Sequence, residues 1–109
     1  MCGVLAGNML FVSGQVALNS STGQMENADI SAEANQVMKN LSAILEEAGF
    51  SFTDVVKSSI FLKDLNNFNI VNEIYGAYFT ENPPARETVE VSKLPKDVNV
   101  EISCIAAKG

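Results

Sequence analysis

The chain has 109 residues, enough for one hydrophobic core, and we expect a single domain over residues 1–109. Seven basic and 13 acidic side chains give a formal net charge of −6, which disfavours nucleic acid as a partner because binding a polyanion requires a basic surface. The chain contains no histidine, which excludes Ser-His-Asp and Cys-His catalysis and histidine-ligated metals.

Cysteine usage and targeting patterns indicate a reducing compartment. Two cysteines are too few for a disulfide framework or a closed zinc site, and Cys104, within an alternating apolar run, is expected to be a small buried hydrophobe. The start of the chain lacks the basic region of a signal peptide, and no apolar run approaches the ~20 residues that span a bilayer. We therefore expect a soluble cytoplasmic protein with no metal site and no cofactor.

The first half of the chain predicts a strand, a turn and a long helix. Residues 9–13 form a near-continuous apolar run that Gly14 interrupts, which predicts a buried strand that residues 16–18 would continue, followed by a turn at residues 19–23. From Ala34 the apolar period becomes helical. Asp29 and Ser31 are candidate N-caps for this helix, and Gly49 is its natural stop.

The second half predicts a strand at 55–62, a polar break, and a helix whose apolar stripe runs from Phe68 to Phe79 and ends at the Pro83–Pro84 pair. Alternating patterns predict two final strands, at residues 86–91 and 98–106. The order β(β)αβαββ indicates an α+β fold, with a mostly antiparallel sheet and two helices packed on one face.

Arg86 is the only arginine, and it follows the turn-forming residues Pro83, Pro84 and Ala85. A guanidinium is a rigid fork of five donors that binds a carboxylate or phosphate in a bidentate manner, which lysine cannot do. Because the other six basic residues are lysines, the sequence favours a geometric role for Arg86.

Glu101 is the candidate partner of Arg86. The short connection between the last two strands makes them plausible sheet neighbours, and adjacent strands would project both side chains to one rim. Arg86 would then hold a substrate carboxylate while Glu101 orients or deprotonates a water molecule. The alternatives are a structural ion pair between the two residues, or a Glu101 that is only a polar strand residue.

Four further residues are candidates for the same site. Gly14, after Ser13, permits a bulge or a close approach of the backbone, and its amide could donate to an anion. Thr88 shares the strand parity of Arg86 and would flank the same pocket. Asn72 lies beside the apolar stripe of the second helix, where it would pin a loop at the site or bond a neighbouring backbone.

The apolar pattern also bears on assembly. The strands carry apolar residues on more than one face, whereas the helices cover only one side. The uncovered face would need burial against another copy, which predicts a homo-oligomer with sites at subunit boundaries.

Six segments form a recognisable series: 10–15 (LFVSGQ), 55–57 (VVK), 61–64 (FLKD), 71–75 (VNEIY), 82–91 (NPPARETVEV) and 94–102 (LPKDVNVEI). In this order and spacing they closely resemble the reactive intermediate deaminase family, also known as RidA, YjgF or L-PSP. The resemblance covers essentially the whole chain. It implies a chorismate-mutase-like fold, a homotrimer with a cleft at each subunit interface, and hydrolysis of reactive enamines and imines such as 2-aminoacrylate to 2-oxo acids and ammonia.

The resemblance also implies roles for the candidate residues. Arg86 corresponds to the arginine that binds the substrate carboxylate, and Glu101 to the glutamate that positions the attacking water. Three further correspondences complete the cleft: Ser13 and Gly14 match its Ser-Gly pair, Asn72 its helical asparagine, and Thr88 a position that is often cysteine. An imine is already electrophilic, so its hydrolysis needs no metal or covalent nucleophile.

The chain departs from the family pattern in two places. It has no counterpart of the Gly-Pro-Tyr segment whose tyrosine lines the cleft in relatives, which predicts a more open site, and Ser103 replaces what is commonly a second glutamate. The rival functions are a trimer that binds small carboxylic acids without turnover, as a sensor or chaperone, and the ribonuclease activity that the name L-PSP carries.

Overall fold

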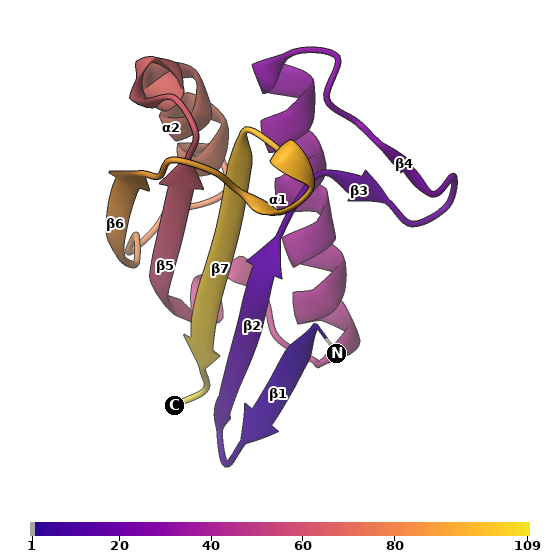
Figure 1. Ribbon diagram of the computed structural model, residues 1–109. Helices are drawn as coiled ribbons and strands as arrows, with labels where there is room; N and C mark the ends of the chain where they lie inside the picture. The colour runs from indigo at the N-terminus through magenta and orange to yellow at the C-terminus, as the bar shows by residue number, and fades with distance from the viewer. Residues whose placement is uncertain (1) are drawn as a thin grey trace.

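A computed structural model describes residues 2–109 as a five-stranded sheet with two helices on one face (Figure 1). The strand order is β1-β2-β7-β5-β6, and every neighbouring pair is antiparallel except β5 and β6, which run parallel because α2 crosses between them. The expected α+β architecture is confirmed. In chain order the elements are β1 (Gly3–Ala6), β2 (Met9–Gln15), β3 (Leu18–Asn19), β4 (Gln24–Met25), α1 (Ile30–Glu47), β5 (Val55–Leu62), α2 (Phe68–Gly76), β6 (Ala85–Glu90) and β7 (Val100–Ala107).

Helix α1 begins and ends where its local chemistry predicts. Asp29, rather than Ser31, is the N-cap, and its Oδ1 accepts a hydrogen bond from the amide of Ala32 at 2.7 Å. Gly49 follows the helix with φ of +81°, a left-handed conformation that glycine adopts without steric cost. The apolar stripe packs against the sheet, and its buried members are Ala34, Val37, Met38, Leu41 and Leu45.

Helix α2 is shorter than the sequence predicts. It ends at Gly76, so the expectation that it continues to Pro83 is wrong. Glycine is a poor helix former. Beyond it, the amides of Tyr78 and Phe79 donate to the carbonyls of Tyr75 and Gly76, three residues back, as in a 3₁₀-helix rather than an α-helix. The ring centres of Tyr78 and Phe79 then lie 5.1 and 5.3 Å from that of Phe52, so aromatic packing fixes the segment that follows the helix.

Strand β2 is also shorter than expected, because the sequence predicts that it continues through residue 18. Strand β2 stops at Gln15, and Leu18 begins β3, which pairs with β4 in a separate two-stranded sheet around the expected turn. The two final strands are not neighbours, which corrects a second expectation: β5 lies between β6 and β7. This insertion decides where the candidate residues lie.

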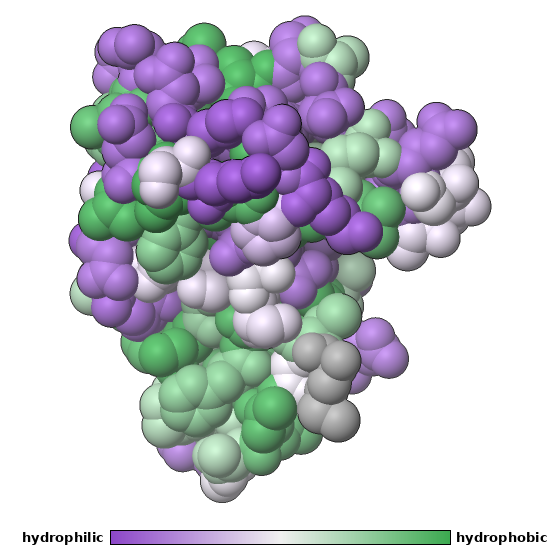
Figure 2. Space-filling model, viewed as in Figure 1, coloured by the Kyte–Doolittle hydropathy of each residue, from purple (hydrophilic) through white to green (hydrophobic). Residues whose placement is uncertain are grey.

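The sheet has one covered and one open face. Residues that face the helices are almost fully buried, among them Ile60, Ile102 and Cys104, the last as expected. On the opposite face Phe11 and Val89 remain 41% and 42% exposed. Figure 2 shows apolar side chains gathered over the end of the molecule that holds β1, the start of β2 and the end of β7, with polar side chains at the other end. Within residues 2–109, no helix combines the length and apolarity needed to span a membrane.

Candidate functional site

One face of α2 holds the guanidinium of Arg86. Arg86 is the second residue of β6, and its Nη1 donates a hydrogen bond to Oδ1 of Asn72. Its Cζ lies 5.7 Å from the centre of the Phe68 ring and 5.3 Å from that of Tyr75. These three residues are four and three positions apart, so they share one helical face and bind the cation by one hydrogen bond and two cation–π contacts.

Arg86 opens onto a small cavity. The cavity has a volume of about 230 Å³ and lies between α2 and the start of β6. Asn72 is the one hydrogen-bond acceptor that the described residues offer to the guanidinium, so most of its five donors remain available to a bound carboxylate. The residues that line the cavity are Asn72, Tyr75, Gly76, Phe79, Pro83, Pro84 and Arg86.

Two hydroxyl groups near Arg86 are buried without a hydrogen-bond partner among the described residues: those of Tyr75 and Thr88. Thr88 follows Arg86 by two positions in β6 and therefore faces the same side of the sheet, as expected. Burial raises the pKa of the Tyr75 phenol, and the nearby Ser58 hydroxyl and Arg86 charge offset this only in part. Tyr75 is therefore a neutral group, able to donate a hydrogen bond. In the sequence Tyr75 is recognisable only as a member of the apolar stripe of this helix.

Glu101 forms a second cluster with the end of β2. The pairing of β2 with β7 shifts by one residue between Val12 and Gln15, so Ser13 and Gly14 lie in a β-bulge. A methyl group at Gly14 would lie 2.6 Å from the carboxyl carbon of Glu101 and 2.9 Å from its Cγ. The close approach expected at Gly14 is thus confirmed, and the group that approaches is Glu101.

Ser13 donates its hydrogen bonds to Cys2, the residue directly before β1. Its Oγ and its amide both donate to the carbonyl of Cys2, at 3.1 and 2.9 Å. The bulge therefore presents Gly14 to Glu101 while Ser13 holds the first strand in place.

The chain does not bring Arg86 and Glu101 together. Arg86 pairs across the sheet with Ser58, whereas Glu101 pairs with Phe61. These rows are three residues apart along β5, so the two side chains leave opposite faces of the sheet, and strand geometry separates their Cα atoms by about 14 Å. The expectation of one shared rim is wrong for a single chain.

The alternative of an Arg86–Glu101 ion pair is wrong as well. The ion pairs among residues 2–109 join Lys57 to Glu87 at 3.2 Å and Lys63 to Asp97 at 2.6 Å. The structure thus divides the candidates into two groups. Asn72 and Thr88 lie with Arg86 on the helix side, and Ser13 and Gly14 lie with Glu101 at the bulge.

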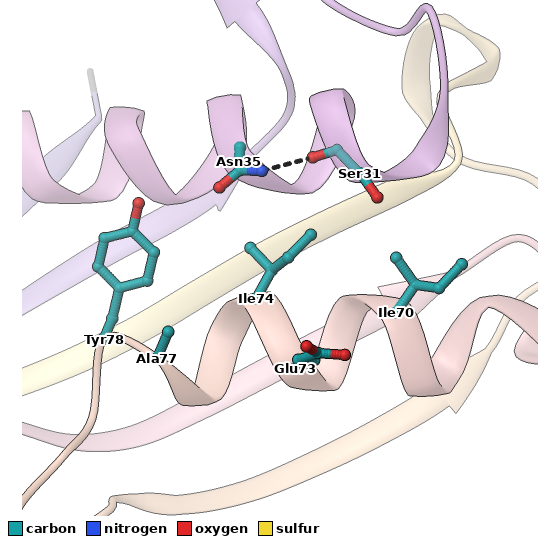
Figure 3. Close-up of a pocket in the computed structure, with 7 residues that line it drawn as sticks. All are labelled: Ser31, Asn35, Ile70, Glu73, Ile74, Ala77 and Tyr78. Carbon is teal, nitrogen blue, oxygen red and sulfur yellow. Dashed lines mark hydrogen bonds between the residues drawn. The ribbon is translucent and has the colours of Figure 1, made fainter.

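A larger cavity, of about 560 Å³, lies between α1 and α2 (Figure 3). Ile70 and Ile74 point into it from α2, with Tyr78 at one end and Ser31 and Asn35 opposite on α1. It contains none of the six candidate residues. Within residues 2–109, no cluster of three or more His, Cys, Asp or Glu side chains is placed to hold a metal ion.

Comparison with known proteins gives a consistent result. The family model described as Endoribonuclease L-PSP matches residues 2–108. The 2-iminobutanoate/2-iminopropanoate deaminase of Escherichia coli K12 is 49% identical to this chain, over 97% of this chain and 84% of the length of the deaminase. Two solved E. coli structures are also similar, each with a TM-score of 0.94 over 100% of this chain and 87% of theirs: YjgF, 46% identical, and TdcF with bound serine, 38% identical.

Proposed function

The chain belongs to the RidA/YjgF/L-PSP family, and on this basis we propose that it hydrolyses small reactive enamines and imines to 2-oxo acids and ammonia. The observation that carries the proposal is the Arg86 pocket. A guanidinium held by Asn72 and two aromatic rings, with donors left open to a cavity, is suited to a small carboxylate. 2-Aminoacrylate is such a substrate.

The chemistry needs few groups. The enamine tautomerises to an imine, and water adds to the C=N carbon to give a carbinolamine. Glu101 accepts one proton from the attacking water and returns it to the nitrogen, which becomes the amino group of the carbinolamine. The proton of the carbinolamine hydroxyl then passes to the same nitrogen, again through Glu101, so that the C–N bond breaks, ammonia leaves and the carbon becomes the carbonyl of the 2-oxo acid. Arg86 anchors the substrate carboxylate throughout, so binding and proton transfer are separate tasks of separate residues.

A complete site requires two copies of the chain. Arg86 and Glu101 leave opposite faces of one sheet, so a cleft that uses both must draw them from different subunits. The open sheet face, with Phe11 and Val89 exposed, offers the apolar area that such an assembly would bury. Both features support a homotrimer with one cleft at each boundary, the assembly that the family resemblance implies.

A coupled assay that generates 2-aminoacrylate tests the proposal. Ammonia release should be accelerated by the unmutated protein and not by Arg86→Ala or Glu101→Gln. Arg86→Lys should lose most of the activity, because a point charge does not replace a bidentate fork. Lys39→Ala, which removes an exposed cation from α1, is the matched control and should stay fully active. Retention of full activity by the Arg86 and Glu101 variants would refute the mechanism.

A second candidate is carboxylate binding without turnover. One observation favours it: a single chain holds the Arg86 pocket complete, but not the Glu101 carboxylate beside it. Binding of a 2-oxo acid to the unmutated protein, without faster loss of the imine, would support this function over the deaminase. Ribonuclease activity, named in the family description, is disfavoured by the net charge of −6 and the absence of histidine.

A further inference from the structure

Glu33 is a charged side chain in the core. It lies in the first turn of α1 and is 0% exposed. Its Oε2 accepts hydrogen bonds from the amides of Asn99, at 2.7 Å, and Val100, at 3.2 Å, and its Oε1 accepts one from Nδ2 of Asn99, at 2.9 Å. The carboxylate therefore joins the start of α1 to a segment 66 residues away.

A buried carboxylate is an expensive way to join two segments. Removing such a group from water costs several kcal/mol unless hydrogen bonds or a counter-charge compensate. The ion pairs of the described residues do not include Glu33, so neutral donors alone satisfy it. Glu33 also lies on the apolar stripe of α1, four residues before Val37, where an aliphatic side chain would cost less. The presence of a carboxylate at this position is therefore explained by the residues that it binds.

The bound segment is the entry to β7, directly before Glu101. Strand β2 accompanies β7 only as far as the pairing of Gln15 with Ile102. Beyond that point the N-terminal end of β7 has a strand neighbour, β5, on one edge only. At this end a single side chain, Glu33, accepts the hydrogen bonds of two successive amides, those of Asn99 and Val100.

The loop before β7 needs this support. Lys96 and Asp97 adopt left-handed backbone conformations, with φ of 57° and 55°, which are strained for residues other than glycine. On the other side, the amide of Lys63 donates to the carbonyl of Asn99 at 3.0 Å. Asn99 is thus held from α1 and from the end of β5 at once, and the chain leaves it in a fixed direction.

We propose that Glu33 is a positioning residue for Glu101. It fixes the backbone of Asn99 and Val100, and thereby the point from which the Glu101 side chain extends, while Gly14 limits the space that this side chain can occupy. The inference rests on the role given to Glu101 in the proposed function. Glu33 itself touches neither substrate nor water in this scheme.

Steady-state kinetics on Glu33→Gln give the first test. The substitution preserves shape but turns an N–H toward a donor, so one bond to the β7 entry is lost. We expect kcat to fall about tenfold or more, since a misplacement of about 1 Å can cost a hundredfold, with KM within about twofold because the Arg86 pocket is untouched. Equal loss in kcat and in substrate binding would indicate a general structural effect and overturn the proposal.

Asp54→Ala is the matched control. Asp54 accepts a hydrogen bond from the amide of Ser51 at 2.9 Å, beside the start of β5 and so at the opposite end of the sheet from Glu101. The variant loses a comparable polar contact without touching β7 near Glu101. Each variant is measured at the same interval below its own Tm. Under this condition Asp54→Ala should keep the kcat of the unmutated protein, whereas Glu33→Gln should not. A matching loss of kcat in the control would overturn the proposal.

NMR separates this inference from the proposed function. In Glu33→Gln the amides of Asn99 and Val100 should exchange with solvent at least about tenfold faster, and the carboxyl-carbon resonance of Glu101 should move from its place in the unmutated protein. An unchanged Glu101 resonance would overturn the positioning role whatever the kinetics show. If instead Glu101→Gln retains full turnover, the proposed function fails, while the Glu101 resonance still decides whether Glu33 positions Glu101.

Discussion

Arg86 and Glu101 leave opposite faces of one sheet, in rows three residues apart along β5. No rotamer change brings the two side chains together within a chain, because the sheet itself lies between them. Each residue nevertheless sits among partners that restrict it: α2 holds Arg86, and the β2 bulge confines Glu101. Under the proposed function each chain thus carries two half-sites, and turnover would depend on how copies of the chain meet.

Mixing two inactive variants should restore activity. In a homotrimer made from equal amounts of Arg86→Ala and Glu101→Gln chains, some boundaries combine an intact arginine from one chain with an intact glutamate from the next. Random assembly makes about one boundary in four intact, so about a quarter of the unmutated activity should return after the chains are unfolded and refolded together. A mixture no more active than its parents would mean that subunits do not share the site.

Gly14→Ala should inactivate the protein without unfolding it. A methyl group there would lie 2.6 Å from the Glu101 carboxyl carbon, and Glu101 can rotate away at small cost in stability. We expect kcat to fall at least tenfold, with the free energy of unfolding changed by less than about 1 kcal/mol. In a Glu101→Gln background the same substitution should change kcat little. Full additivity of the two losses would show that Gly14 acts elsewhere.

Asn72 should govern substrate binding more than turnover. Asn72→Ala releases the guanidinium of Arg86 from its acceptor, and one such hydrogen bond is worth about 1–1.5 kcal/mol, or about tenfold in KM. Asn72→Asp should be worse, because a carboxylate beside Arg86 competes with that of the substrate. Calorimetry should show that pyruvate binds most tightly to the unmutated protein, less tightly to Asn72→Ala and least tightly to Asn72→Asp. Tighter binding in Asn72→Asp would exclude Arg86 as the carboxylate anchor.

The local signals were enough to place most of the fold. The cap at Asp29 and the left-handed Gly49 bracket α1 within a few residues, so its bounds follow from chemistry that the sequence displays. The bulge at Gly14 is likewise a local event. The end of α2 does not follow from the pattern, because the aromatic stripe continues past Gly76, whereas the packing of Tyr78 and Phe79 on Phe52 depends on a distant part of the chain.

Long-range pairing could not be obtained from pattern alone. A short connection suggested that the last two strands are neighbours, but β6 pairs in parallel with β5 through the α2 crossover, which leaves β7 on the far side. The sequence pattern therefore predicts Arg86 and Glu101 as candidates but places them at one rim, whereas they leave opposite faces of the sheet. Glu33 gave one usable signal, a carboxylate on an apolar helical stripe, but its partner lies 66 residues away.

Cys104 should make stability fall in mildly alkaline solution. Burial raises the pKa of its thiol from 9.0 to about 11, so the folded state keeps a proton that the unfolded chain loses. This contribution is complete below pH 9 and is lost as the pH rises toward 11, at about 1.4 kcal/mol per unit. Urea unfolding at fixed protein concentration should show it, with Cys2→Ser as the background to remove the exposed thiol.

Cys104→Ala in that background isolates the contribution. Its stability is lower at pH 8.5 because a buried sulfur is deleted, but it should lose about 2–3 kcal/mol less than its parent between pH 8.5 and 11. Tyr75, whose pKa is raised first of all by burial, acts in the same direction in both proteins, and only the smallest cause of its shift, the charge of Cys104, differs between them. Parallel curves for the two proteins would mean that the thiol ionises as readily in the folded chain as in the unfolded one.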